Sequence, residues 1–278
     1  SYQRRNNNDD YVKDFYDVLG PNNESFNTSL SLDYKNDYTF DNFGSNVKIN
    51  TEKSFLTIGA FAQKTVLDGQ IISNDFELSR SQWNVLPRLN WKYSFTKSSR
   101  LTFNYTTNVN EPSLEQLQPT IDNSDPLNIY EGNPNLKTEY RHNGNMRFMS
   151  FNQFSFTNVF AMLNATYTLN KITNEQYLNS QFIQTTRPIN VDRDLNVSAY
   201  GYFGTPIRAI RSKISIRANT TYGKSILYVN RVENDVDRYF NSVDLRLENR
   251  KKDLIDAGIG VELSQTITQY SISSALNQ

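Results

Sequence analysis

The sequence predicts an all-β protein, an antiparallel up-and-down β-barrel whose strands cross a membrane. Three observations predict this fold. Apolar and polar residues alternate along many segments, the connections between these segments are alternately short and long, and the segments exceed the usual length of strands in soluble sheets. A composition with 17 Tyr and 17 Phe also favours strands over helices.

The segment 83–95 shows the alternation most clearly. Its odd positions are Trp83, Val85, Pro87, Leu89, Trp91, Tyr93 and Phe95, and its even positions are Asn84, Leu86, Arg88, Asn90, Lys92 and Ser94. Successive side chains of a strand point to opposite faces of the sheet. We therefore expect the odd residues to face lipid and the even residues to face the lumen, because the reverse would place Arg88 and Lys92 in hydrocarbon.

Similar alternation recurs in residues 29–34, 101–106, 210–219, 243–248 and 255–264. Together these patterns predict about eleven strands between residues 27 and 267. A strand of about thirteen residues is about 43 Å long, and at a tilt of about 40° it crosses an apolar band about 25 Å tall. Strands of soluble proteins usually stop at about 5–6 residues.

The predicted connections are unequal in length. Short polar turns are expected near residues 51–54, 96–99, 152–153, 205–208 and 250–253. Longer loops are expected at about 67–80, 110–138, 171–190 and 225–236. Residues 1–26 are interpreted as another loop, in the middle of which the given sequence begins, and residues 27–278 as the partial barrel. Outer-membrane barrels have short periplasmic turns and long extracellular loops. We therefore expect 110–138 to be the longest connection and to lie on the extracellular side.

The composition excludes several kinds of function. The 29 basic and 29 acidic residues balance, so no nucleic-acid partner is expected. The chain has no Cys and one His, His142, which we interpret as a strand or loop residue. The Asp-rich stretch 122–125 lacks the glycine and distal glutamate of a calcium loop. We expect no metal, no cofactor and no catalytic constellation, and hence no enzyme.

Residues 110–142 contain the most specific motif of the chain. A run that resembles the mid-barrel signature of TonB-dependent receptors consists of Gly132, Asn133, Pro134, Asn135, Leu136, Lys137, Thr138 and Glu139, with Thr138 where a proline is usual. The preceding residues are similar to the variant in the outer-membrane β-barrel family of Bacteroidota, namely Pro112, Ser113, Gln116, Leu117, Gln118, Pro119, Asp122, Asn123, Ser124, Asp125, Pro126, Leu127 and Asn128. Residues 184–191 and 67–69 also resemble that family.

The residues of this motif favour turns. A proline restricts the residue before it to extended conformations, which applies to Asp125 and Asn133. Gly132 permits a positive φ, and Asn and Asp side chains can close turns onto the backbone. The motif therefore predicts an ordered structural loop, with direct contact to a ligand as the alternative.

The resemblance implies active import. In that family an outer-membrane receptor binds a scarce solute, and an inner-membrane complex that works through TonB releases it inward. A plug domain and the TonB complex are thus implied as partners, besides the lipid of the outer membrane. Iron chelates, glycans and peptides all remain open as solutes. Barrels of plugged transporters have about 22 strands, so about eleven strands make half of one.

Two other classes of protein fit the same patterns. One is a passive or structural outer-membrane barrel, such as a porin or a secretion-associated protein, and the other is a soluble all-β binding module. An odd number of strands and a polar beginning without a signal peptide indicate a fragment, since bacterial single-chain barrels have even numbers of strands. We therefore expect the first and last strands not to pair with each other.

Overall fold

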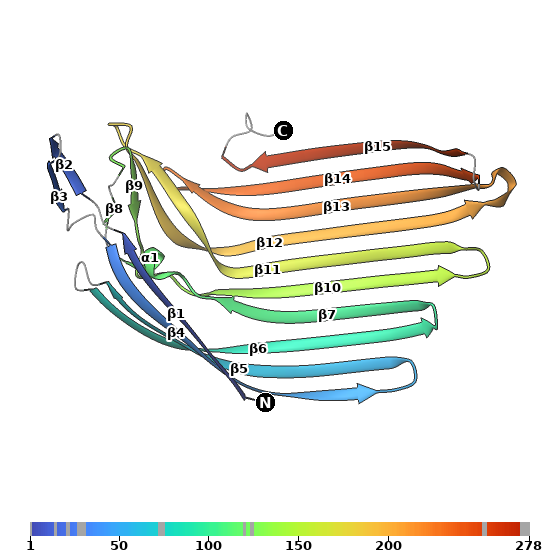
Figure 1. Cartoon of the computed structure of the whole chain (residues 1–278), viewed down its shortest axis with the longest axis horizontal. Helices are drawn as coiled ribbons and strands as arrows, with labels where there is room; N and C mark the ends of the chain where they lie inside the picture. Colours follow the sequence, from blue (N-terminus) through green and yellow to red (C-terminus); the bar gives the residue numbers. More distant parts are fainter. Residues whose placement is uncertain are drawn as a thin grey trace.

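A computed structural model describes residues 2–13, 16–20, 23–26, 32–71, 76–118, 121–122, 125–251 and 255–272. Most of these residues form one antiparallel sheet, in which eleven long strands lie side by side (Figure 1). Their order is β1 (Tyr2–Lys13), β4 (Leu32–Asn50), β5 (Ser54–Ile71), β6 (Phe76–Thr96), β7 (Ser99–Asn110), β10 (Glu139–Asn152), β11 (Thr157–Leu178), β12 (Gln184–Ile207), β13 (Ser212–Val229), β14 (Val232–Lys251) and β15 (Ile255–Tyr270). The predicted all-β antiparallel fold is confirmed.

The remaining elements are short. They are β2 (Tyr16–Gly20), β3 (Asn23–Phe26), α1 (Leu114–Leu117), β8 (Ile121–Asp122), β9 (Asn128–Glu131) and the 3₁₀ turn η2 (Arg208–Ile210). The sheet is open within the described residues, where β1 and β15 form its two opposite edges (Figure 1). No helix of the described part is long and apolar enough to span a membrane.

The predicted short turns lie together at one end of the sheet, on the right in Figure 1. They cover residues 51–53, 97–98, 153–156 and 208–211, while residues 252–254 lie outside the described ones. Residues 111–138 form the longest connection that the structure describes, although they contain α1, β8 and β9. The proposed extracellular position of this connection stays a prediction.

The predicted long loops at 67–80, 171–190 and 225–236 are wrong. Strands β11 and β12 continue to a turn at 179–183, and β13 and β14 to a turn at 230–231. Asn230 and Arg231 both have positive φ, as a tight two-residue hairpin turn requires. These strand ends carry polar residues on both faces, for example in 173–176. Alternation disappears there because both faces meet water.

The loop expected at residues 1–26 is also wrong. Strand β1 pairs with β4 along its whole length, from Tyr2 opposite Phe43 to Lys13 opposite Leu32, and β2 pairs with β3. The Tyr2 hydroxyl donates a hydrogen bond to Asp41 at 2.8 Å, and its ring stacks on Phe43 at 4.9 Å. An Asn- and Asp-rich sequence has low strand propensity, and pairing with β4 overrides that preference.

The two faces of the sheet follow the predicted parity. Trp83 and Val85 are 60% and 64% exposed, whereas Leu86 is 3% exposed. The even residues Arg80 and Gln82 contact residues 111–138, so these residues lie on the face predicted to line the lumen. We call this face the inner face and the opposite one the outer face.

Aromatic residues form two rows on the outer face. Near the short turns, Trp91, Tyr93, Phe95 and Phe148 make successive ring contacts at 4.9–6.2 Å. Towards the other end lie a second row with Tyr105, Tyr140, His142 and Tyr167, and the pair Tyr222 and Tyr239. Aromatic girdles border the apolar band of outer-membrane barrels on both sides. The outer face therefore has the pattern of a surface that contacts lipid.

Candidate functional site on the inner face

A small hydrophobic core fixes the segment 111–138 to the sheet. Ser113 caps α1 by accepting a hydrogen bond from the Gln116 N–H at 3.2 Å, and the Gln116 side chain accepts one from the Ser113 N–H at 3.0 Å. This reciprocal capping box orients the short helix. Leu117 and Leu136 are then buried against Leu67 of β5. Burying one such side chain stabilises by about 1.5–3 kcal/mol.

Position 132 requires a glycine because its backbone lies very close to the backbone of residues 115–118. A Cβ atom at this position would lie 2.0 Å from the Gln118 carbonyl oxygen and 3.0 Å from that of Glu115. Gly132 does not adopt the positive φ that a glycine permits, since no described glycine has one. The absence of a side chain lets the next amide, that of Asn133, donate to the Gln116 carbonyl at 2.6 Å.

One side of the segment is anchored to β4 and β6. The Tyr38 hydroxyl donates to the Pro112 carbonyl at 2.8 Å. The Gln82 amide donates to Glu111 at 2.9 Å and to Thr138 at 2.5 Å. The guanidinium of Arg80 donates to the Leu136 carbonyl at 2.5 Å. Both ends of the segment are thus held by the same strand.

The other side is anchored to β12. Asn133 donates from its side chain to the Pro188 carbonyl at 3.0 Å, while its own side-chain oxygen accepts from the Asn135 N–H. Asn190 accepts from the Lys137 N–H at 2.7 Å and donates back to the Lys137 carbonyl at 3.0 Å. Residues 111–138 therefore bridge the inner face between strands that are far apart in the sheet.

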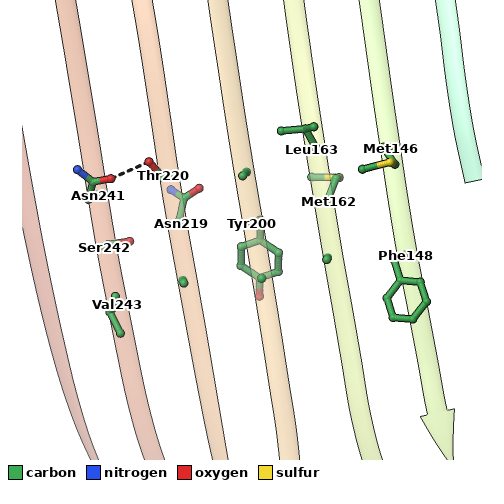
Figure 2. A pocket seen from close by; sticks show the side chains of 14 residues that line it. Met146, Phe148, Met162, Leu163, Tyr200, Asn219, Thr220, Asn241, Ser242 and Val243 are labelled. Atoms are coloured by element: carbon green, nitrogen blue, oxygen red, sulfur yellow. Dashed lines mark hydrogen bonds between the residues drawn. The ribbon is translucent and has the colours of Figure 1, made fainter. Parts of the chain in front are cut away.

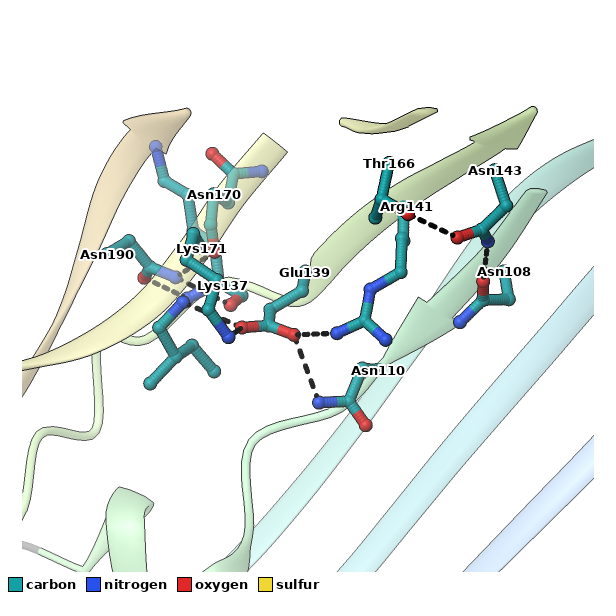
Figure 3. A network of polar contacts seen from close by, with 11 residues as sticks. Asn108, Asn110, Lys137, Glu139, Arg141, Asn143, Thr166, Asn170, Lys171 and Asn190 are labelled. Atoms are coloured by element: carbon teal, nitrogen blue, oxygen red, sulfur yellow. Dashed lines mark hydrogen bonds and ion pairs between the residues drawn. The ribbon is translucent and has the colours of Figure 1, made fainter. Parts of the chain in front are cut away.

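Glu139 is the centre of a polar network where the segment enters β10 (Figure 3). Its side chain is 2% exposed and accepts hydrogen bonds from the Lys171 ammonium at 2.8 Å, the Ile172 N–H at 2.9 Å and the Asn110 amide at 3.1 Å. The Arg141 guanidinium lies 3.4 Å away. A buried carboxylate is tolerated only when charged and hydrogen-bonding partners surround it.

The Ile172 amide is available because β11 is irregular just before it. Asn170 has a positive φ of 50° and interrupts the ladder between Leu169 opposite Arg193 and Lys171 opposite Val191. The Asn190 side chain donates to the Asn170 carbonyl at 2.7 Å. Glu139 and Asn190 thus satisfy the backbone groups on both sides of this irregularity.

A turn at residues 125–128 forms the exposed tip of the segment. The Asp125 carboxylate accepts from the Leu127 N–H at 3.0 Å and from the Asn128 amide at 2.8 Å. The bond from Asn128 lowers the pKa of Asp125 below its ordinary value. The following strand β9 pairs in parallel with β12, and Gln184 donates to the Leu127 carbonyl at 2.8 Å.

Tyr130 occupies the middle of β9. Its partner in β8 is Asp122, and β9 also pairs with β12 through Thr186. Burial, followed by the negative charge of Glu115, raises the pKa of Tyr130 to about 12. The ring therefore stays neutral in the ordinary pH range.

The structure separates the motif residues into two groups. The first group holds the segment together through buried side chains or backbone contacts, and consists of Pro112, Gln116, Gly132, Asn133, Leu136 and Glu139. The exposed ones are Asp125, Pro126, Leu127, Asn128 and Pro134. Pro119 and Asn123 lie outside the described residues, and Asp122 is placed through its backbone pairing.

Several residues of the site were not recognised in the sequence. Arg80 and Gln82 precede the clearest alternating segment, and nothing local indicates that their side chains reach a loop. Lys171 lies in a stretch interpreted as a loop. Asn190 lies at the end of the same predicted loop and also in the family-like stretch 184–191. That resemblance was the one available signal for the β12 anchor.

Among the described residues no group of three His, Cys, Asp or Glu side chains could hold a metal ion. His142 lies in β10, and its Nδ1 is 2.7 Å from the Tyr105 hydroxyl on the outer face. The contacts on the inner face bind both backbone and side-chain groups of the segment 111–138.

Comparison with known proteins gives two kinds of match. The ferric enterobactin receptor of Pseudomonas aeruginosa, solved with enterobactin, is 12% identical over 98% of this chain and 52% of the receptor, with a TM-score of 0.40. The siderophore receptor PirA of Acinetobacter baumannii is 10% identical over 98% of this chain and 54% of the receptor, also with a TM-score of 0.40. The chain spans about half the length of these receptors. No curated protein matches.

The second match is to a family model. The model described as "Outer membrane protein beta-barrel family" matches residues 1–275. This match covers nearly the whole chain and agrees with the antiparallel sheet and the two aromatic rows. The chain belongs to the outer membrane protein beta-barrel family and is a protein of the outer membrane.

Proposed function

We propose that this chain is part of the barrel of a TonB-dependent receptor, which binds a scarce solute and imports it across the outer membrane. The proposal rests on the segment 111–138, which contains the receptor-like run and is fastened across the inner face between β4–β6 and β11–β12. A plug domain and the TonB complex are its proposed partners, and the Bacteroidota form of the family its proposed origin. We propose no enzymatic activity.

A fixed segment on the inner face suits a receptor better than an open pore. It reduces the lumen at the end away from the short turns, where a solute would enter if those turns are periplasmic. The exposed side chains of Asp125, Asn128, Asn135 and Lys137 offer hydrogen-bond donors and acceptors there.

The proposal is tested in cells that produce the full-length protein. Uptake of labelled ferric siderophores, oligosaccharides and peptides is compared in the parent strain, in a strain without this gene and in a strain without TonB. We expect one solute class to be taken up by the parent and lost equally in both deletions. Uptake that survives the loss of TonB would identify a passive pore and refute the proposal.

A matched pair of variants tests the role of the segment. Lys137→Ala removes an exposed charge but keeps the backbone bonds to Asn190, so we expect a higher solute concentration for half-maximal uptake. Lys97→Ala removes another exposed charge, from a short turn at the opposite end, and should leave uptake unchanged. Equal effects of the two variants would contradict a solute-binding role for the segment.

A further inference from the structure

A hollow of about 450 Å³ lies on the outer face across β10 to β14 (Figure 2). It exists because three small residues occupy one row across three neighbouring strands, where Ala161 pairs with Gly201 and Gly201 pairs with Ala218. Larger residues close the row on both sides, Phe148 opposite Ala161 and Val243 opposite Ala218. The volume lies within the range of about 300–1,000 Å³ that is typical of ligand pockets.

The hollow is empty at its centre. A Cβ atom added to Gly201 would meet no atom within 4 Å. Side chains that face lipid in a barrel are mostly large and apolar. A shallow apolar trough in such a surface leaves room for one slender apolar chain from the surrounding membrane.

One end of the trough is polar. In the row next to the small residues, on the side away from the short turns, Thr220 pairs with Asn241. The Thr220 hydroxyl donates to the Asn241 side-chain oxygen at 2.6 Å (Figure 2). Within the described residues the Asn241 amide nitrogen has no acceptor. Hydrocarbon cannot supply one, and an unpaired polar group in hydrocarbon is strongly disfavoured.

The aromatic residues indicate how deep in the membrane this polar end lies. Tyr222 and Tyr239, whose ring centroids are 4.9 Å apart, lie in the next row beyond Thr220 and Asn241. Aromatic side chains mark the border between hydrocarbon and head groups. The Asn241 amide therefore lies just inside that border, where the ester and amide linkages of acyl chains are found.

We propose that the hollow binds one acyl chain of an outer-leaflet glycolipid of the lipid A type. The chain lies along Ala161, Gly201 and Ala218, and the carbonyl oxygen of its linkage accepts a hydrogen bond from the Asn241 amide. The assignment to the outer leaflet rests on the orientation in the proposed function, in which the short turns are periplasmic. A lipid fits better than a second protein because the hollow covers only two outer-face residues on each strand and is polar only at one end.

Native mass spectrometry of the full-length protein in a mild detergent tests this site. Lipid A and phosphatidylethanolamine are added separately at equal concentration. We expect one molecule of lipid A to stay bound, and Gly201→Leu to weaken its binding at least tenfold. Ala60→Leu places a leucine at an exposed outer-face position on β5, away from the hollow, and should retain parental binding.

A second variant tests the contribution of the hydrogen bond separately from that of the apolar trough. Asn241→Leu keeps the apolar trough and removes the donor, so lipid A binding should fall severalfold while the detergent-folded barrel keeps its heat-modifiable gel mobility. If Gly201→Leu fails to fold by that criterion, Ala218→Leu takes its place. Equal lipid A binding by parent and trough variants, preferential retention of phosphatidylethanolamine, or a second protein chain in place of lipid would overturn the proposal.

The failure of this inference can be told apart from a failure of the proposed function. Gly201→Leu and Asn241→Leu lie on the outer face and should leave TonB-dependent uptake unchanged. Uptake that stays TonB-dependent while lipid binding is absent would refute the lipid site alone. Lipid A binding without TonB dependence of uptake would refute the import function alone.

Discussion

The two ends of the sheet are stabilised in different ways. At the end that carries 111–138, called the packed end, the side chains of Leu114, Leu117 and Leu136 are at most 1% exposed. At the end with the short turns, called the bare end, Val47, Ile49 and Phe95 are 65%, 52% and 50% exposed. The packed end has a core like that of a soluble protein, whereas the bare end depends on lipid to cover its apolar side chains.

This difference determines which substitutions should be harmful. At the packed end, stability depends on filled volume and on paired polar groups, as in any protein interior. At the bare end it depends on the polarity of each face, because lipid adapts its shape to a side chain but cannot solvate a charge. The following substitutions are ordered by the size of their expected effects.

Glu139→Ala at the packed end should have the largest effect. It leaves Lys171, Arg141 and the Ile172 amide without their shared acceptor. Removing one partner of a buried ion pair costs about 3–5 kcal/mol, which detergent-based urea unfolding of the refolded barrel would measure. Glu52→Ala on an exposed short turn is the matched control and should change stability little. Equal stability of the two variants would show that the network is not structural.

Leu89→Arg should have the next largest effect and Asn90→Arg almost none. Leu89 belongs to the outer face of β6, where an arginine costs about 2–4 kcal/mol near the midplane of the bilayer and less near its borders. Asn90 belongs to the inner face and hydrogen-bonds to Asn104. Folding efficiency into lipid vesicles, followed by gel mobility, compares the two. If the Leu89→Arg variant folded and the Asn90→Arg variant did not, the assignment of the lipid-facing and lumen-facing sides of β6 would have to be reversed.

Gly132→Ala should destabilise the packed end by about 1–3 kcal/mol, the usual cost of overpacking. Its methyl group would meet the Gln118 carbonyl oxygen at 2.0 Å. Gly201→Ala on the outer face is the control, since the added Cβ meets no atom within 4 Å. Limited proteolysis near residues 125–128 reports the loosening of the segment. If the Gly132→Ala variant resisted proteolysis as well as Gly201→Ala does, the close packing of Gly132 against Gln118 would be contradicted.

Ser113→Ala should have the smallest effect of the set. It removes the N-cap of α1, a change that typically costs about 1 kcal/mol. Unfolding of the refolded barrel in urea measures the difference, with Ser81→Ala on an exposed strand position as the control. A cost equal to that of Ser81→Ala would mean that the tertiary contacts of Leu114 and Leu117 hold the helix without its cap.

The same contrast explains which parts of the structure the sequence predicts. The faces of residues 83–95 are predictable because lipid and lumen select different side chains at alternate positions. The strand ends beyond Lys171 are not, because water on both faces removes the alternation. In β1, pairing with β4 imposes a strand on residues that favour loops.

The candidate site was predictable only in part. The turn at Asp125 and the crowded Gly132 belong to one continuous motif, so their structural role could be inferred from it. The anchors could not, because the Arg80 and Gln82 side chains bind residues 56 positions away and Asn190 binds Lys137 53 positions away. Contacts of this kind depend on the register of the whole sheet.

We propose that the packed end lies outside the cell and the bare end in the periplasm. The chain has no cysteine, so single cysteines introduced at exposed positions can be labelled selectively. A membrane-impermeant maleimide is applied to intact cells that produce full-length protein with Asn135→Cys or Lys97→Cys. We expect labelling of Asn135→Cys in intact cells and of Lys97→Cys only after the outer membrane is permeabilised. Labelling of Lys97→Cys in intact cells, with Asn135→Cys labelled only after permeabilisation, would contradict it.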